Sequence, residues 1–164
     1  MTARGVHFAI SPEMAQRFQA AEGDDDTLLE LVEELEEAWD KHNLAESDKA
    51  WDAMHRCLTD GELLFGNGEP PLNSVVLGPR QLCDGDDYII CLALADEVAA
   101  AAAAIRDLDE AWFRHRYETV CPRDYAPEYG EQDRDYTWSY FKAVRELFLK
   151  AAQRGQAVVF TVDQ

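Results

Sequence analysis

A long amphipathic helix followed directly by an apolar strand constrains the fold of this chain more than any other feature. In residues 134–154, apolar side chains recur at helical spacing and form one broad face. Gly155 suits the position just past a helix end, and residues 156–162 are typical of a strand. Because the connection is short, we expect the helix to lie over the sheet that contains this strand.

Two further segments indicate strands of the same sheet. Residues 88–94 are almost continuously apolar, with aromatic and β-branched members, which predicts a buried central strand. Residues 6–10 form a shorter β-like run, and residues 74–77 are either a short strand or an extended piece. Residues 42–47 are expected to be a connector.

Helical spacing and capping signals predict further helices around this sheet. Ser11 and Pro12 suit the N-cap and first position of a helix over residues 12–21. The other predicted helices cover residues 27–41, 48–59, 95–106 and 109–117. We therefore expect a helix-rich α+β fold in a single domain over residues 1–164, with about six helices covering a small mixed sheet.

The formal net charge of −18 restricts the classes of partner. A field of this sign repels phosphate backbones and anionic lipid headgroups, so neither nucleic acid nor a membrane is an expected partner. A basic protein or a divalent cation is electrostatically allowed. Acidity also serves solubility alone, and the sequence leaves both interpretations open.

Part of this charge is concentrated on the helix predicted at residues 27–41. Its apolar positions share one arc, while acidic residues occupy the other side: Glu30, Glu33, Glu34 and Glu37. This surface is either a docking face for a basic partner or an ordinary solvated face. Like charges four residues apart destabilise a helix, so the composition is not optimised for helix stability alone.

The cysteines and the N-terminal sequence indicate a reduced, cytoplasmic setting. The chain has four cysteines, Cys57, Cys83, Cys91 and Cys121. They form no Cys-x-x-Cys motif, and their spacing matches no zinc-binding signature. The N-terminus lacks an apolar core of signal-peptide length, and acidic residues interrupt the longest apolar tract, residues 88–105. Gly66-x-Gly68 lacks the rest of a dinucleotide-binding motif, so no cofactor is expected.

Residues 48–59 bring a histidine closest to possible chemical partners. Asp52 and His55 are three residues apart and Trp51 and His55 four apart, so each pair is close on a helix surface. One hypothesis is a binding pocket in which Asp52 orients the imidazole. A second is metal binding through Asp48, Asp52 and His55. The third is a buried histidine that hydrogen-bonds Asp52 or a backbone carbonyl, beside an inward-facing Trp51.

A long irregular segment, residues 119–133, is the other candidate for a binding surface. It contains Tyr125 and Tyr129, and tyrosines on a loop offer a large amphipathic contact area at low entropic cost. The alternative is a packed loop without such a role.

Three motifs occur in a defined order along the chain. They are Lys49-x-Trp51-Asp52-x-x-His55-x-x-Leu58-Thr59, then Leu72-Asn73-Ser74-Val75-Val76-Leu77-Gly78, then Tyr140-Phe141, Ala151-Ala152 and Gly155-x-Ala157. Together they resemble the YfbM-like family of small uncharacterised bacterial proteins. The resemblance implies an α+β fold and implies no activity, because the family has none assigned.

No complete catalytic motif accompanies these features, so a non-enzymatic protein is expected. The sequence favours a binding or protein-interaction module with an acidic surface, of the kind by which an immunity or inhibitor protein covers a basic partner. Two alternatives stay open. One is a small-ligand-binding protein or enzyme with a pocket near His55, and the other is metal binding through Asp48, Asp52 and His55.

Overall fold

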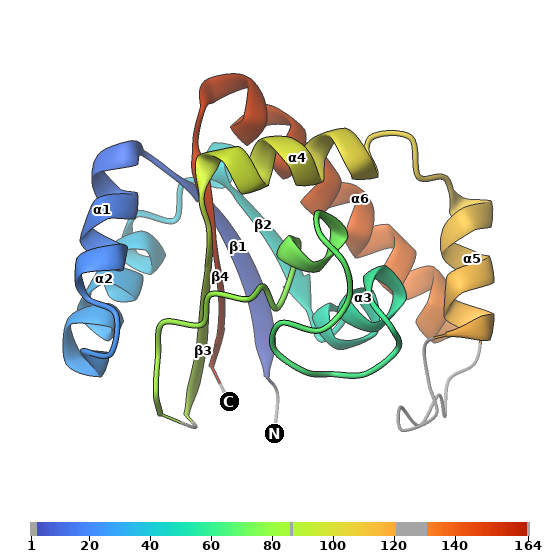
Figure 1. The fold of residues 1–164 in the computed structure, drawn as a ribbon, viewed down its shortest axis with the longest axis horizontal. Coiled ribbons are helices and arrows are strands. Elements are labelled where there is room, and N and C mark those ends of the chain that lie inside the picture. The colour runs from blue at the N-terminus through green and yellow to red at the C-terminus, as the bar shows by residue number, and fades with distance from the viewer. Residues whose placement is uncertain (1–2, 86, 121–130, 164) are drawn as a thin grey trace.

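Four strands form one antiparallel sheet in the computed structural model, which describes residues 3–85, 87–120 and 131–163 (Figure 1). The strand order is β2-β1-β4-β3. Every neighbouring pair is antiparallel, so the prediction of a mixed sheet is wrong. The strands are β1 Arg4–Ile10, β2 Leu44–Asp48, β3 Tyr88–Ala93 and β4 Ala157–Asp163.

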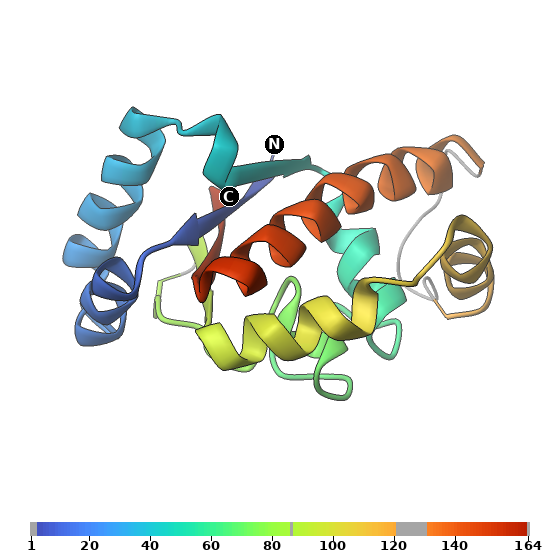
Figure 2. The same cartoon turned by 90° about the horizontal axis from the view of Figure 1, so that it is seen from above.

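Helices lie on both sides of this sheet. Seen from above, α1 and α2 lie on one side, whereas α3, α4, α5 and α6 lie on the other (Figure 2). Six α-helices in the described part of the chain confirm the predicted helix-rich α+β fold. They are α1 Pro12–Ala20, α2 Asp25–Ala38, α3 Trp51–Leu58, α4 Ala95–Ile105, α5 Glu110–Thr119 and α6 Glu131–Arg154, with short 3-10 helices at Lys41–Asn43 and Leu72–Ser74.

Alternation along the strands produces two hydrophobic cores, one on each face. In β4, Val158, Phe160 and Val162 belong to the core beneath α3 to α6, whereas Ala157 and Val159 belong to the core beneath α1 and α2. Strand β4 is therefore apolar on both faces. None of the described helices is both long and apolar enough to cross a lipid bilayer.

The predicted central position of residues 88–94 is wrong, because β3 lies at the edge of the sheet. Its apolar character arises from cores on both faces rather than from strands on both sides. The preceding segment covers its outer edge: the Leu82 amide donates to Ile90 O at 2.8 Å, and the Leu92 amide donates to Arg80 O at 3.1 Å. These bonds satisfy backbone groups that an edge strand would otherwise expose.

Three local assignments also differ from the sequence prediction. The expected connector at residues 42–47 contains β2, and Asp48 at its end has a left-handed φ of 47°. The expected helix over residues 48–59 therefore begins only at Trp51. Residues 74–77 are not a strand, since the 3-10 helix Leu72–Ser74 and turns occupy this region.

The capping predictions at Ser11, Pro12 and Gly155 are confirmed. The Ser11 hydroxyl accepts a hydrogen bond from the Met14 amide at 3.1 Å, and Pro12 is the first residue of α1. Gly155 has a left-handed φ of 65° between α6 and β4. The turn is closed by the Gln156 amide, which donates to Ala151 O at 2.9 Å. As expected, α6 folds back over the sheet (Figure 1).

Candidate functional site

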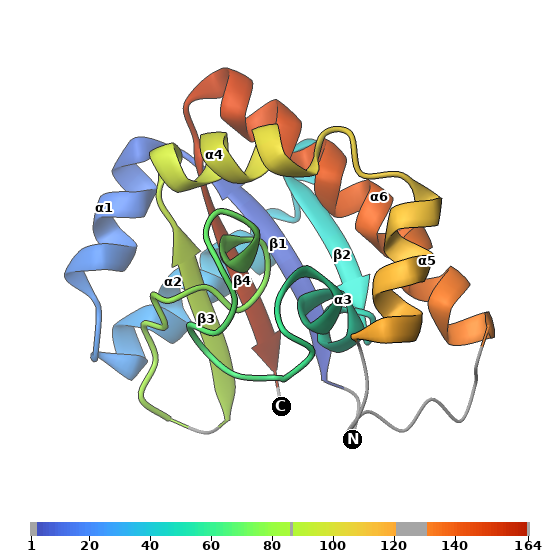
Figure 3. The same cartoon turned by 45° about the vertical axis from the view of Figure 1, so that its right-hand side comes forward.

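Helix α3 lies over the sheet on the same side as α5 and α6, and the chain after it loops across the same face (Figure 3). Trp51, Met54 and Leu58 are buried in the core, as their spacing predicts. The Trp51 indole N–H donates to Ala3 O at 3.0 Å, and its ring lies 5.9 Å from that of Phe160. Trp51 thus anchors α3 to the sheet.

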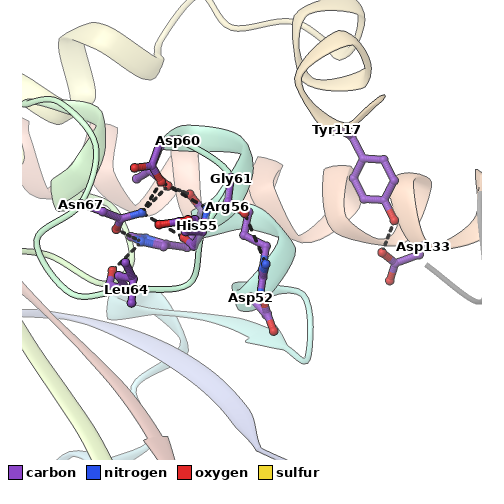
Figure 4. Close-up of polar contacts among 11 residues, drawn as sticks. Asp52, His55, Arg56, Asp60, Gly61, Leu64, Asn67, Tyr117 and Asp133 are labelled. Atoms are coloured by element: carbon purple, nitrogen blue, oxygen red, sulfur yellow. Dashed lines mark hydrogen bonds and ion pairs between the residues drawn. The ribbon is translucent and has the colours of Figure 1, made fainter. Parts of the chain in front are cut away.

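His55 is buried, with 1% of its surface exposed, and both of its ring nitrogens contact protein groups. Nδ1 accepts a hydrogen bond from the Leu77 amide at 3.3 Å. The proton of the neutral ring therefore resides on Nε2, which lies 2.7 Å from Asn67 Oδ1 and 3.0 Å from Leu64 O (Figure 4). Burial lowers the pKa of His55, and the bonds to Asn67 and Leu64 oppose this shift.

Asn67 extends this network into residues 59–68, which we call the His55 loop. Its amide nitrogen lies 2.6 Å from Asp60 Oδ1 and 2.9 Å from Glu62 O (Figure 4). The bond from Asn67 holds the pKa of Asp60 below its usual value. The Thr59 hydroxyl donates to His55 O at 2.7 Å. A buried histidine and one asparagine therefore fix the path of the whole loop.

Asp52 does not orient the imidazole, contrary to the pocket hypothesis. Its Oδ1 pairs with Arg56 Nε at 2.6 Å, and Arg56 also donates to Gly61 O at 3.3 Å (Figure 4). Of the sequence hypotheses for His55, the geometry matches the buried histidine bound to a backbone carbonyl. Its two nitrogens are already engaged, so the ring is not available to a ligand in this conformation.

The proposed metal ligands also have separate partners. Asp48 accepts a hydrogen bond from the Tyr136 hydroxyl at 2.5 Å and pairs with Arg4 at 3.3 Å. Burial and the neighbouring Asp48 carboxylate raise the pKa of Tyr136. Across the described ranges, no group of three histidine, cysteine or acidic side chains is placed to hold a metal ion.

The acidic face of α2 is exposed, as its spacing predicts. It consists of Glu30, Glu33, Glu34 and Glu37, which we call the α2 acidic face. Glu34 forms a two-bond pair with Arg17 at 2.8 and 3.0 Å. No arginine or lysine in the described part of the chain forms a salt bridge with the other three carboxylates.

Two hollows are bordered by residues of α1 and α2. One, of about 270 Å³, is bordered by Arg17, Glu30 and Glu34. The other, of about 320 Å³, lies between β1 and the α1–α2 pair, and its lining includes Phe8, Met14, Leu35, Asp40 and Asn43. Sequence analysis missed this second hollow, because it depends on how the two helices sit against the strand.

A second buried histidine was also missed. His7 in β1 is fully buried, and its ring centroid lies 4.5 Å from that of Phe160. Its Nε2 lies 2.7 Å from Val75 O. Burial lowers the pKa of His7 to about 4. Its alternation with Phe8 in the predicted strand could have placed the two side chains on opposite faces of the sheet.

The two tyrosines proposed as a binding rim, Tyr125 and Tyr129, lie outside the described residues. The described surface instead presents Leu64 and Phe65, which are 52% and 43% exposed. Both belong to the His55 loop. The only sequence signal for this surface was an apolar stretch followed by glycines.

Comparisons with known proteins agree with the resemblance found in the motifs. The crystal structure of YfbM from Escherichia coli, a protein of unknown function, aligns with a TM-score of 0.62 at 20% identity, covering 99% of each chain. This likeness supports the fold alone. No curated protein matches the chain. The model of the domain of unknown function DUF1877 matches residues 1–161. The chain therefore belongs to this YfbM-like family of domains of unknown function.

Proposed function

We propose that this protein is a non-enzymatic interaction module that binds a basic protein surface through the α2 acidic face. The observation that carries the proposal is the negative charge of α2, of which Glu34 alone forms a salt bridge, with Arg17, in the described part of the chain. The helix contains seven acidic residues and no basic residue. A partner that brings lysine or arginine side chains to this face would supply the missing counter-charges.

The distribution of arginines explains why most of this charge has no positive partner within the chain. Most of them are engaged elsewhere within the chain, in pairs or with backbone carbonyls. Arg56 pairs with Asp52 and Arg80 with Glu97, while Arg145 donates to Leu108 O. These arginines therefore connect elements of the fold, and they are not available to neutralise the carboxylates of α2.

The arrangement within α2 also has an energetic cost that binding would relieve. Glu30 and Glu34 are four residues apart, as are Glu33 and Glu37, and such like-charged pairs destabilise a helix by about 0.2–0.5 kcal/mol each. Burial, followed by the neighbouring Asp163 and Glu33 carboxylates, raises the pKa of Glu36 on the same helix. Covering a basic partner in this way is how an immunity or inhibitor protein would act.

The test compares two variants with the same net charge. The triple variant E30Q/E33Q/E37Q removes three negative charges from α2, and the control D107N/E131Q/E146Q removes three from exposed positions on the other side of the sheet. Each is used to capture partners from the native lysate at about 0.05 M and about 0.5 M salt. We expect one partner whose capture is lost at high salt and in the α2 variant but retained by the control.

Two outcomes would contradict the proposal. The first is a partner captured equally by both variants, because the α2 carboxylates would then not be its contact. The second is capture that does not respond to salt, since exposed charges are strongly screened at the higher concentration. Binding measured afterwards with the purified partner should be about tenfold or more weaker for the α2 variant.

A further inference from the structure

We propose that the His55 loop forms a second contact surface, in which Leu64 and Phe65 insert into an apolar pocket rimmed by basic residues on a partner protein. This surface lies on the side of the sheet opposite α2 (Figures 2 and 3). It goes beyond the function proposed above, because it adds a contact region with a different chemistry.

The first observation is the exposure of two adjacent large apolar side chains. Leu64 and Phe65 are the large hydrophobic residues that are exposed in the described part of the chain. The preceding residue, Leu63, packs against the core beneath α3 to α6. The loop therefore has an apolar side chain that anchors it and two that point outward. Large apolar side chains such as leucine and phenylalanine are stabilised when an interface removes them from water.

The second observation is that the loop is held rigid from beneath. The buried His55 contacts Leu64 O, so it fixes the backbone of one of the two exposed residues directly. Asn67 ties the two ends of the loop together through Asp60 and Glu62. Much of the ordering entropy is thus lost during folding rather than on binding, which favours tight association.

The third observation is the charge around the apolar pair. The loop carries Asp60 and Glu62, with Glu69 just beyond it, and residues 57–79 contain no lysine or arginine. Two arginines reach the loop from outside: Arg56 pairs with Asp52 and donates to Gly61 O, and Arg116 donates to Thr59 O. Asp60 is held in its charged form by the bond from Asn67. An acidic rim repels both anionic lipid and the same rim of a second copy of this chain. It matches a partner pocket bordered by lysine or arginine.

The test places a photoreactive benzoyl-phenylalanine at position 65 of the full chain in its native cells, with the exposed Ala143 on α6 as the control position. We expect irradiation to attach one protein at position 65 and not at position 143. An adduct with the mass of two copies of this chain would overturn the proposal. Attachment to lipid, or no adduct at position 65, would overturn it as well.

The second step measures the affinity of the purified, captured protein. Leu64→Ser should weaken binding by about tenfold or more, with Ala143→Ser unchanged and circular dichroism unaltered. Asn67→Ala keeps both apolar side chains but loosens the loop, and it should weaken binding as well. Equal affinity of wild type and Leu64→Ser would refute the loop surface. That result is distinct from failure of the α2 proposal, which E30Q/E33Q/E37Q tests separately.

Discussion

Acidification should destabilise the native protein through His7, and the size of the effect follows from its burial. The ring is fully buried among aromatic side chains, and its pKa is lowered to about 4. In the unfolded chain the same group titrates near its ordinary value of about 6.5. Between these values the unfolded state binds a proton that the native state does not. The contribution of His7 to the free energy of unfolding is therefore fully present above pH 6.5 and is lost as the pH falls toward 4.

The magnitude comes from the difference between the two pKa values. Each pKa unit corresponds to about 1.4 kcal/mol, so the full loss attributable to His7 is about 3 kcal/mol near pH 4. At pH 5 it is about 2 kcal/mol relative to pH 7. Other groups also titrate in this range, so the measurement compares wild type with His7→Gln, which keeps an N–H donor for Val75 O.

The assay is urea unfolding of both proteins at pH 7, 6 and 5. Any loss of stability that His7→Gln causes at every pH cancels when the change in unfolding free energy between two pH values is compared. The lowered pKa of His55 acts in the same direction, but both proteins contain His55, so its contribution cancels as well. We expect wild type to lose about 2 kcal/mol more than the variant between pH 7 and pH 5. Parallel loss in the two proteins would refute a neutral, buried His7.

Two substitutions test the local geometry. Asn67→Ala removes the hydrogen bond to His55 and the bonds that close the His55 loop. It should lower the free energy of unfolding by about 1–3 kcal/mol, measured by thermal or urea unfolding. The control Asn43→Ala removes one exposed hydrogen bond and should lower it by less. Equal costs would contradict the bracing role of Asn67. Gly155→Ala imposes a left-handed φ on alanine without a steric contact, so it should cost about 1 kcal/mol. Gly78→Ala, at an ordinary φ, is its control, and an unchanged midpoint for Gly155→Ala would exclude backbone strain at this turn.

Most of the secondary structure could be predicted from the sequence, because its signals act over a few residues. Ser11 and Gly155 mark helix ends through contacts with their immediate neighbours. The apolar runs of β1, β3 and β4 identify strands whatever their order. Strand β2 escaped prediction because its short sequence, Leu-Ala-Glu-Ser-Asp, has no strong β character and is stabilised by pairing with β1.

The candidate site was less predictable, since its contacts depend on where distant segments meet. Spacing along a helix predicted that Asp52 lies near His55, but the Asp52 carboxylate forms a salt bridge with Arg56 on the same helix. The partners of His55 instead come from the chain that follows α3, namely Leu64, Asn67 and Leu77. No periodicity encodes such loop contacts. The exposed acids of α2, in contrast, followed directly from helical spacing.

The sequence by itself determined the α+β class, the family, the long C-terminal helix with its following strand, and the acidic side of α2. Each depends on local periodicity, capping or composition. Only the tertiary structure decided that β3 lies at the edge, that His7 meets Val75 across 68 residues of chain, and that His55 braces a loop with Leu64 and Phe65 exposed. Such outcomes depend on which strands pair and how loops close over the sheet, and those contacts form between residues far apart in the sequence.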